Sequence, residues 1–239
     1  MTAQAATAHQ PAGTRLLEML MGSLRPLLLL LMVAVMFAAA GSARWGPGWR
    51  FIAALFGLLA FNAPVLLLTN REIVKERLKT HRDTEPFDRT FAALDCLGLL
   101  ALVIVAGLDA GRFGWAVLPP WLAWTGVALM AAGDLLCLWA MRTNRFVETT
   151  VRIQEDRGHQ VITTGPYHYV RHPMYAGFIP MTAGMALVLE SAWALVPAAL
   201  LCGLVIWRLL REERVLAARL PGYTEYMAET RWRLVPGIW

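Results

Sequence analysis

Charged residues are scarce in this chain: they make up 16% of its 239 residues, whereas hydrophobic residues make up 57%. Ordinary soluble domains carry about 25% charged residues, so the composition excludes the soluble globular class. The mean hydropathy of +0.49 also indicates a membrane protein. The net charge of +5 comes without a nucleic-acid-binding motif, so no nucleic-acid partner is expected. Basic clusters in loops instead orient membrane proteins and attract anionic lipid headgroups.

Cysteine is almost absent as well. The three cysteines lie singly inside apolar runs, at Cys96, Cys137 and Cys202. Because none of them forms a C-x-x-C pair, the sequence predicts neither a disulfide framework nor a cysteine zinc site.

Metal-binding patterns are also lacking, since the chain has no H-E-x-x-H sequence. His159, His168 and His172 lie close in sequence, and a helix would bring the last two onto one face. However, Pro173 disfavours helical structure at the residue before it. We therefore predict no catalytic metal.

Long apolar runs are what the chain has in abundance. A membrane-spanning helix needs about 20 mostly apolar residues, and four runs of the chain fit this requirement. Two shorter apolar runs follow them and are separated only by Glu190 and Ser191. The predicted fold is therefore all-α: a polytopic membrane bundle with four transmembrane spans, a C-terminal helical hairpin and a cofactor-binding tail. The predicted spans are residues 26–43, 51–70, 90–108 and 113–141, and the hairpin comprises residues 173–189 and 191–207.

The chain divides into three parts on this prediction. Residues 1–13 are small and polar and are expected to be disordered. The first apolar run starts too late for a cleaved signal peptide, so it is interpreted as a retained helix. Residues 14–141 form the N-terminal transmembrane helices. Residues 142–239 form the catalytic region within the same membrane domain.

Loop charge predicts the orientation in the membrane. Arginine and lysine cluster between spans two and three, between span four and the hairpin, and in the tail. The positive-inside rule makes these segments cytoplasmic, together with both termini. The opposite loops hold few basic residues, and Trp45, Trp49 and Trp115 near them are predicted to form an interfacial aromatic belt.

A polar stretch rich in aromatic rings, residues 165–177, stands between two apolar runs. Tyr167, Tyr169 and Tyr175 could stack against a flat heterocycle. Arg171 and His172 could bind a carboxylate. If Pro173 begins a helix, these two residues lie at its N-terminus, where an anionic group is favoured. The alternative is that the same residues merely line the membrane interface.

A second charged cluster follows the hairpin. Arg208, Glu212 and Arg219 are spaced to share one helical face, and Glu213 lies beside Glu212. A carboxylate here could hold a ribose hydroxyl pair or a cationic centre, and an arginine could receive an anionic acceptor. The alternative is a solvated, salt-bridged helix end. The tail, residues 220–239, mixes tyrosine, tryptophan and arginine, and is predicted to cover a cofactor pocket or to anchor to the membrane surface.

Together these segments resemble a known family. His159, the run Thr164-Gly165-Pro166-Tyr167, the run Val170-Arg171-His172-Pro173-Met174-Tyr175 with Gly177, the pair Glu212-Glu213, and Tyr223, Tyr226 and Pro236 are similar to the isoprenylcysteine carboxyl methyltransferases. Phospholipid N-methyltransferases share a looser version of the pattern. The resemblance covers roughly residues 159–239.

The resemblance implies an integral membrane methyltransferase that uses S-adenosylmethionine (SAM) and takes a lipophilic acceptor from the bilayer. It implies a cofactor site on the cytoplasmic side formed by His159, Gly165, Tyr167, Arg171, His172, Pro173, Tyr175, Gly177, Glu212 and Glu213. A carboxylate acceptor needs no strong base, and we predict that Arg219 orients it. An amine acceptor would need deprotonation, for which Glu213 is the candidate base.

The acceptor itself is left open. Isoprenylcysteine-type carboxyl O-methylation is the preferred prediction, with phospholipid N-methylation and methylation of a small thiol as alternatives. Membrane sterol reductases, which use NADPH and have a loosely similar tail, form an alternative of another class. A non-catalytic membrane scaffold is a third hypothesis. The oligomeric state is not predicted.

Overall fold

The computed structural model describes residues 27–78 and 84–239. Regular structure in this part of the chain is helical, apart from one isolated β-bridge between Val117 and Ser191. The described residues thus confirm the predicted all-α fold. After a first helix, Leu27–Ala40, the elements are α2 (Gly46–Thr69), α3 (Arg71–Leu78), α4 (Pro86–Ala106), a π-helix η1 (Gly107–Phe113), α5 (Leu122–Thr143), the short 3-10 turns η2 (Glu155–Arg157) and η3 (Gly165–His168), α6 (Pro173–Val188), α7 (Leu195–Arg219) and α8 (Tyr223–Glu229).

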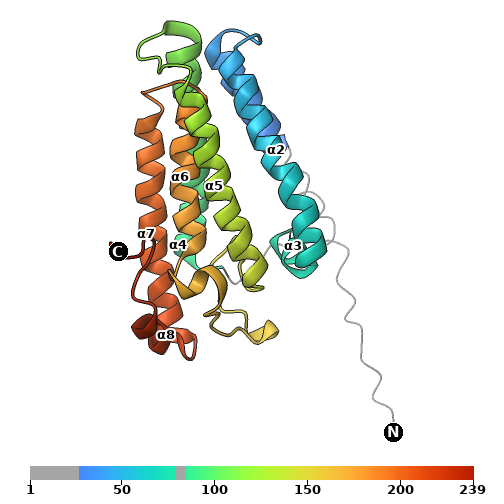
Figure 1. Ribbon diagram of the computed structural model, residues 1–239, viewed down its shortest axis with the longest axis vertical. Helices are drawn as coiled ribbons and strands as arrows, with labels where there is room; N and C mark the ends of the chain where they lie inside the picture. The colour runs from blue at the N-terminus through green and yellow to red at the C-terminus, as the bar shows by residue number, and fades with distance from the viewer. Residues whose placement is uncertain (1–26, 79–83) are drawn as a thin grey trace.

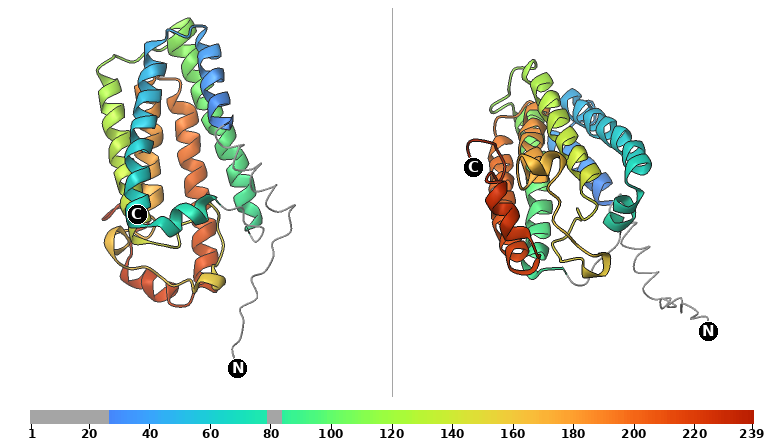
Figure 2. Two further views of the ribbon diagram at one scale, coloured as in Figure 1. Left: turned by 90° about the vertical axis from the view of Figure 1, so that its right-hand side faces the viewer. Right: turned by 60° about the horizontal axis from the view of Figure 1, so that its bottom comes forward.

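The long helices form one elongated bundle (Figure 1). Helices α4, α5, α6 and α7 run side by side, and α2 lies on the outer side of α5, away from α7. The α5–α6 connection, α3 and α8 gather at one end of the bundle, as the two views of Figure 2 show. This end is called the loop end below. The short connections 41–45, 114–121 and 189–194 lie at the opposite end.

Three helical segments of the described chain are long and apolar enough to cross a membrane: α2, α4 together with η1, and α5. The helix Leu27–Ala40 and α6 are apolar but shorter. The predicted first span begins at residue 26, and the predicted disordered segment is residues 1–13, so both reach outside the described residues. The count of four spans therefore stays a prediction, whereas α6 and α7 do form the expected hairpin (Figure 1).

The predicted start of the fourth span is wrong. The fourth span was expected from residue 113, but α5 begins at Leu122, because Gly114 turns the chain with φ +64° and two prolines follow before the helix. The apolar run of the second hairpin helix ends at residue 207, and α7 continues through its charged residues to Arg219, as the predicted helical face of Arg208, Glu212 and Arg219 requires. Its last turns therefore carry polar side chains to the loop end.

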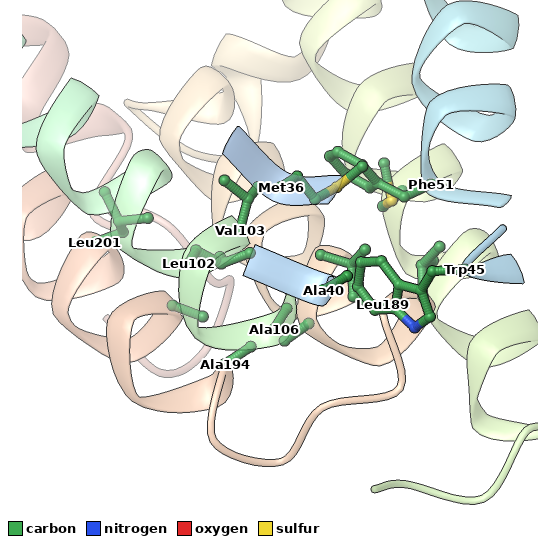
Figure 3. Packing of buried hydrophobic residues seen from close by; sticks show 14 residues of the cluster. Met36, Ala40, Trp45, Phe51, Leu102, Val103, Ala106, Leu189, Ala194 and Leu201 are labelled. Carbon is green, nitrogen blue, oxygen red and sulfur yellow. The ribbon is translucent and has the colours of Figure 1, made fainter. Parts of the chain in front are cut away.

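The main apolar core lies toward the end of the bundle opposite the loop end. Figure 3 shows how its side chains pack. Met36 and Ala40 of the first helix pack there with Leu102, Val103 and other residues of α4, α6 and α7. Trp45 is part of this core and is only 8% exposed, so its predicted place in an aromatic belt is wrong. Trp49 and Trp115, which are 53% and 59% exposed, remain compatible with such a belt.

Helices α5 and α6 approach each other closely through glycines. A Cβ atom on Gly126 would lie 2.7 Å from the carbonyl oxygen of Gly184, and one on Gly177 would fall against the carbonyl oxygen of Gly133. Small residues allow such backbone contact between apolar helices. The contact fixes the start of α6, and with it residues 171–175, against the end of α5.

Candidate functional site

A cavity of about 630 Å³ lies at the loop end and reaches into the bundle. Its volume falls in the range of about 300–1,000 Å³ typical of small-molecule sites. Its walls come from α2, α3, α4, α5, α6, α7 and α8 and from the α5–α6 connection. The predicted site residues that line it are His159, Tyr167, Arg171, His172, Pro173, Tyr175 and Glu212; Gly165, Gly177, Glu213 and Arg219 do not.

The two predicted glycines shape the backbone beside the cavity. Gly165 has φ +60° and begins η3, and a Cβ atom there would lie 2.7 Å from the hydroxyl of Thr143. Its conformation allows the turn that carries Tyr167 into the cavity wall. Gly177 instead packs against Gly133.

Arg171 and Glu213 form a buried ion pair, with 2.7 Å between Nη2 and Oε1. The same guanidinium donates to the carbonyl oxygens of Thr230 and Arg231. Arg233 donates to the other oxygen of Glu213 at 2.8 Å. This cluster fastens the C-terminal segment to the start of α6 and the end of α7.

The backbone donors that precede α6 are already occupied, so the predicted anion position there stays a prediction. The backbone N–H groups of Arg171 and His172 donate to the carbonyl oxygens of Trp232 and Arg233, at 2.9 and 3.0 Å. Pro173 does begin the helix as expected. The C-terminal tail folds back and accepts the hydrogen bonds of these two N–H groups. Local sequence patterns do not reveal a contact between segments so far apart in the chain.

Glu213 is a poor proton acceptor in this setting. Burial alone would raise its pKa, but the adjacent His172, Arg233 and Arg171 side chains outweigh burial and lower the pKa to about 2. The carboxylate is therefore ionised at physiological pH and bound by its neighbours. This argues against the predicted role of Glu213 as a base.

Glu212 has a different environment, although it is the next residue. It lines the cavity and accepts a hydrogen bond from the hydroxyl of Tyr175. The rings of Tyr175 and His172 stack with 5.8 Å between their centroids. One helical turn before Glu212, the guanidinium of Arg208 also lines the cavity and donates to Asp88 at 2.7 Å.

Arg219 lies away from this group. Its side chain is 61% exposed and pairs with Glu85 at 2.7 Å. Arg208 and Arg219 do point to the same side of α7, as predicted, but they lie at different positions along the helix axis. Eleven residues advance about 16 Å along a helix axis, so Arg219 lies in the last turn of α7, where Leu216 and Leu220 line the cavity but the Arg219 side chain does not.

The loop end of the cavity is aromatic. Tyr167, Tyr223 and Tyr226 line it, and the hydroxyl of Tyr226 donates to the carbonyl oxygen of Tyr167 at 2.7 Å. His159 packs against Phe146, and burial together with nearby Arg152 and Arg157 lowers its pKa to about 4. His159 is therefore neutral at physiological pH.

Several buried polar atoms on the cavity wall lack a regular partner among the described residues. They include Nε2 of His172, which is 3.5 Å from Glu213, and the hydroxyl of Tyr223. Leaving such atoms unpaired costs about 1–3 kcal/mol each. A polar ligand in the cavity would supply the missing hydrogen bonds.

The three histidines considered as metal ligands do not come together. Within residues 27–78 and 84–239 no group of three or more His, Cys, Asp or Glu side chains is arranged to hold a metal ion. His159 and His172 line the cavity, whereas His168 borders a separate, open hollow with Trp139 and Tyr169.

Local patterns missed several cavity residues. Tyr223 and Tyr226 belonged to the family pattern but had no assigned role, and Arg208 was noted only for its helical face. Asp95 and Asp134 are single acids inside apolar runs of the sequence. That isolation is the signal that could have identified them.

Comparison with known proteins agrees with this geometry. Residues 121–220 match the family model described as "Phospholipid methyltransferase". An Arabidopsis thaliana protein named "Protein-S-isoprenylcysteine O-methyltransferase B" is 26% identical over 110 residues, which cover 46% of this chain and 51% of that protein. The chain thus spans about half the length of this relative. The two findings confirm the predicted resemblance, and the matched segment contains α5, α6 and α7.

Proposed function

We propose that this chain, whose residues 121–220 carry the features of the phospholipid methyltransferase family, is an integral membrane methyltransferase that uses SAM. The acceptor is lipophilic and reaches the cavity from the bilayer. The preferred reaction is carboxyl O-methylation of an isoprenylcysteine-type acceptor, in line with the name of the Arabidopsis relative. The cavity end of the bundle and both termini face the cytoplasm, as loop charge predicts.

The main observation behind the proposal is that the two ends of the cavity differ in polarity. Its loop end presents aromatic rings, the carboxylate of Glu212 and the unpaired buried polar atoms of His172 and Tyr223. Its other end continues between apolar helices, where Leu59, Phe178 and Met181 line it. A polar cofactor and a lipophilic acceptor can therefore approach one another in a single space.

The residues at the loop end fit SAM. Glu212 offers carboxylate oxygens for the ribose hydroxyls or the positive charge of the sulfonium. The rings of Tyr167 and Tyr223 suit the adenine base, and the hydroxyl of Tyr223 and Nε2 of His172 would gain partners. His159, being neutral, adds no repulsion to a cationic ligand.

The chain's contribution to the reaction is mainly positioning. Bound SAM supplies an activated methyl group, whose transfer to an acceptor oxygen leaves S-adenosylhomocysteine. Holding two reactants in line can lower the barrier by about 7–11 kcal/mol. A carboxylate acceptor needs no base, which agrees with the ion pairing that disables Glu213 as one.

Arg208 is better placed than Arg219 to orient the acceptor. It lines the cavity, and its guanidinium lies 4.4 Å above the ring of Phe91 and 5.8 Å from that of Tyr175. Asp88 and Thr149 take two of its hydrogen-bond donors. A guanidinium has five such donors, so others can bind an acceptor carboxylate. The predicted role of Arg219 can be tested alongside it.

A phospholipid amine is the second candidate acceptor, because the matching family model carries that description. Such an acceptor needs a proton acceptor other than Glu213. Glu212 is a carboxylate that lines the cavity one helical turn from Arg208.

The direct test is transfer of radiolabelled methyl groups from SAM into a membrane extract, followed by identification of the labelled product. We expect label in a base-labile methyl ester of a lipophilic acid. Label in a phospholipid headgroup would select the second candidate. Label in a small thiol would select S-methylation.

Matched variants make the test specific. Glu212→Gln and Arg208→Ala should lose most of the transfer, whereas Glu229→Gln, an exposed acid on α8, should retain it. Transfer no higher than in membranes without the protein, or equal transfer by Glu212→Gln, would refute the proposal. Saturable NADPH binding in place of SAM binding would favour the reductase alternative, and binding of neither would favour a scaffold.

A further inference from the structure

Three polar side chains from three helices line the bundle end of the cavity: Asn62 of α2, Asp95 of α4 and Asp134 of α5. Asn62 donates its amide N–H to Oδ1 of Asp134 at 2.7 Å. One buried oxygen of each side chain has no hydrogen-bond partner among the described residues; the three atoms are Oδ1 of Asn62, Oδ1 of Asp95 and Oδ2 of Asp134.

These oxygens lie in segments that are long and apolar enough to cross a membrane. Asp134 is only 7% exposed, and the apolar residues that line the same cavity include Leu59, Phe178 and Met181. Polar oxygens without partners are costly in such surroundings. Ionisable residues within membrane helices typically mark a ligand path.

The contact between Asn62 and Asp134 explains only part of this arrangement. It joins α2 to α5 and satisfies one oxygen of Asp134. It leaves the second oxygen of Asp134, the oxygen of Asn62 and an oxygen of Asp95 facing the same cavity without a donor. What these atoms have in common is that each can accept a hydrogen bond.

We propose that Asn62, Asp95 and Asp134 recognise a hydrogen-bond donor, a hydroxyl or amino group, carried on the apolar part of the acceptor. This inference rests on the proposed function and narrows its substrate class. The acceptor then has two polar positions: the group that is methylated near Arg208, and a donor group farther along its chain within the bilayer. A plain hydrocarbon tail leaves all three oxygens unpaired, so the site discriminates against it.

The test uses hexadecanoic acid as the plain probe and its hydroxy and amino derivatives, substituted at successive carbons, as donor probes. Binding to the full-length protein in lipid nanodiscs is measured in the presence of SAM. At least one positional isomer should bind about tenfold more tightly than the plain acid, which is the scale of one well-made hydrogen bond to a carboxylate. Equal affinity for every isomer and the plain acid would overturn the proposal.

Variants tie the preference to these residues. The preference should fall to near unity in Asp134→Leu and decrease in Asp95→Leu. It should persist in Leu135→Ala, whose side chain is 51% exposed on the outside of α5. Asn62→Leu provides a second route if Asp134→Leu does not fold. A preference that survives in every folded variant of the three residues would also overturn the proposal.

Measuring SAM binding to the same preparations distinguishes a failure of the proposed recognition site from a failure of the proposed function. If the wild-type protein binds SAM but shows no preference among the probes, the recognition site is wrong while the proposed function stands. If the protein does not bind SAM at all, the proposed function itself fails.

Discussion

Adjacent acidic residues on α7 have opposite environments. Glu213 is 5% exposed and bound by Arg171 and Arg233, whereas Glu212 faces the cavity. Side chains one residue apart on a helix point about 100° away from each other. One acid can therefore fasten the tail while its neighbour remains available to a ligand.

Replacing Glu213 by Gln should mainly destabilise the fold. The change leaves two guanidinium groups without their carboxylate, and breaking a buried ion pair in this way costs about 3–5 kcal/mol. Chemical denaturation of the protein in micelles measures the loss. The exposed Glu229→Gln control should change the free energy of unfolding by less than about 0.5 kcal/mol.

The contrary result for Glu213→Gln would be unchanged stability together with lost SAM affinity. That outcome would make Glu213 a direct ligand contact, as the family resemblance implies. The present geometry instead assigns the contact to Glu212.

His159 should make stability depend on pH on the acid side. Its pKa is about 4 in the folded chain but 6.5 as an ordinary side chain. Between these values the unfolded chain binds more protons, so stability is fully present above about pH 6.5 and falls as the pH drops toward about 4. His159→Asn should flatten this part of a plot of melting temperature against pH. Identical slopes for the two proteins would contradict the assignment.

At the scale of elements, the contact between α5 and α6 determines where the cavity residues lie. Gly177 was predicted from the family pattern as a cofactor contact, but it lies against the backbone of α5. Hydropathy alone predicts that two helices exist. It does not reveal that glycines bring them into contact, because that depends on how the two helices are aligned.

Gly177→Ala should therefore destabilise the bundle. The new methyl group would meet the carbonyl of Gly133, and overpacking of this kind costs about 1–3 kcal/mol. Gly203→Ala on α7 is the matched control, since a Cβ atom there would meet nothing within 4 Å. Thermal unfolding should rank the control at or above the wild-type protein. A Gly177→Ala variant as stable as the control would show that the helices can move apart freely.

The sequence predicted some elements of the site well and others poorly. Pro173 marked the start of α6, and residues 171–175 with Glu212 do line one cavity. These residues share a local motif or a single helical face. The docking of Arg171 onto residues 230 and 231 joins segments that are far apart in the chain. No periodicity encodes such a contact.

At the scale of the whole molecule, the polarity of the interior changes from one end of the bundle to the other. The apolar core with Met36 and Leu102 fills one end, and the cavity with Arg208 and Glu212 occupies the other. Asp95 and Asp134 connect the cavity to the membrane-spanning helices. This gradient from polar to apolar suits a reaction between a nucleotide-like cofactor and a lipid-soluble acceptor.

The central claim, that SAM occupies the loop end of this cavity, can be measured by calorimetric titration of SAM into the protein in lipid nanodiscs. We predict saturable binding at one site per chain. The affinity should decrease about tenfold or more in Glu212→Gln and should decrease in Tyr223→Phe, because each change removes a polar contact in a buried site. It should be unchanged in Glu229→Gln. The absence of saturable binding, or equal affinity in the two cavity variants and the control, would contradict the account.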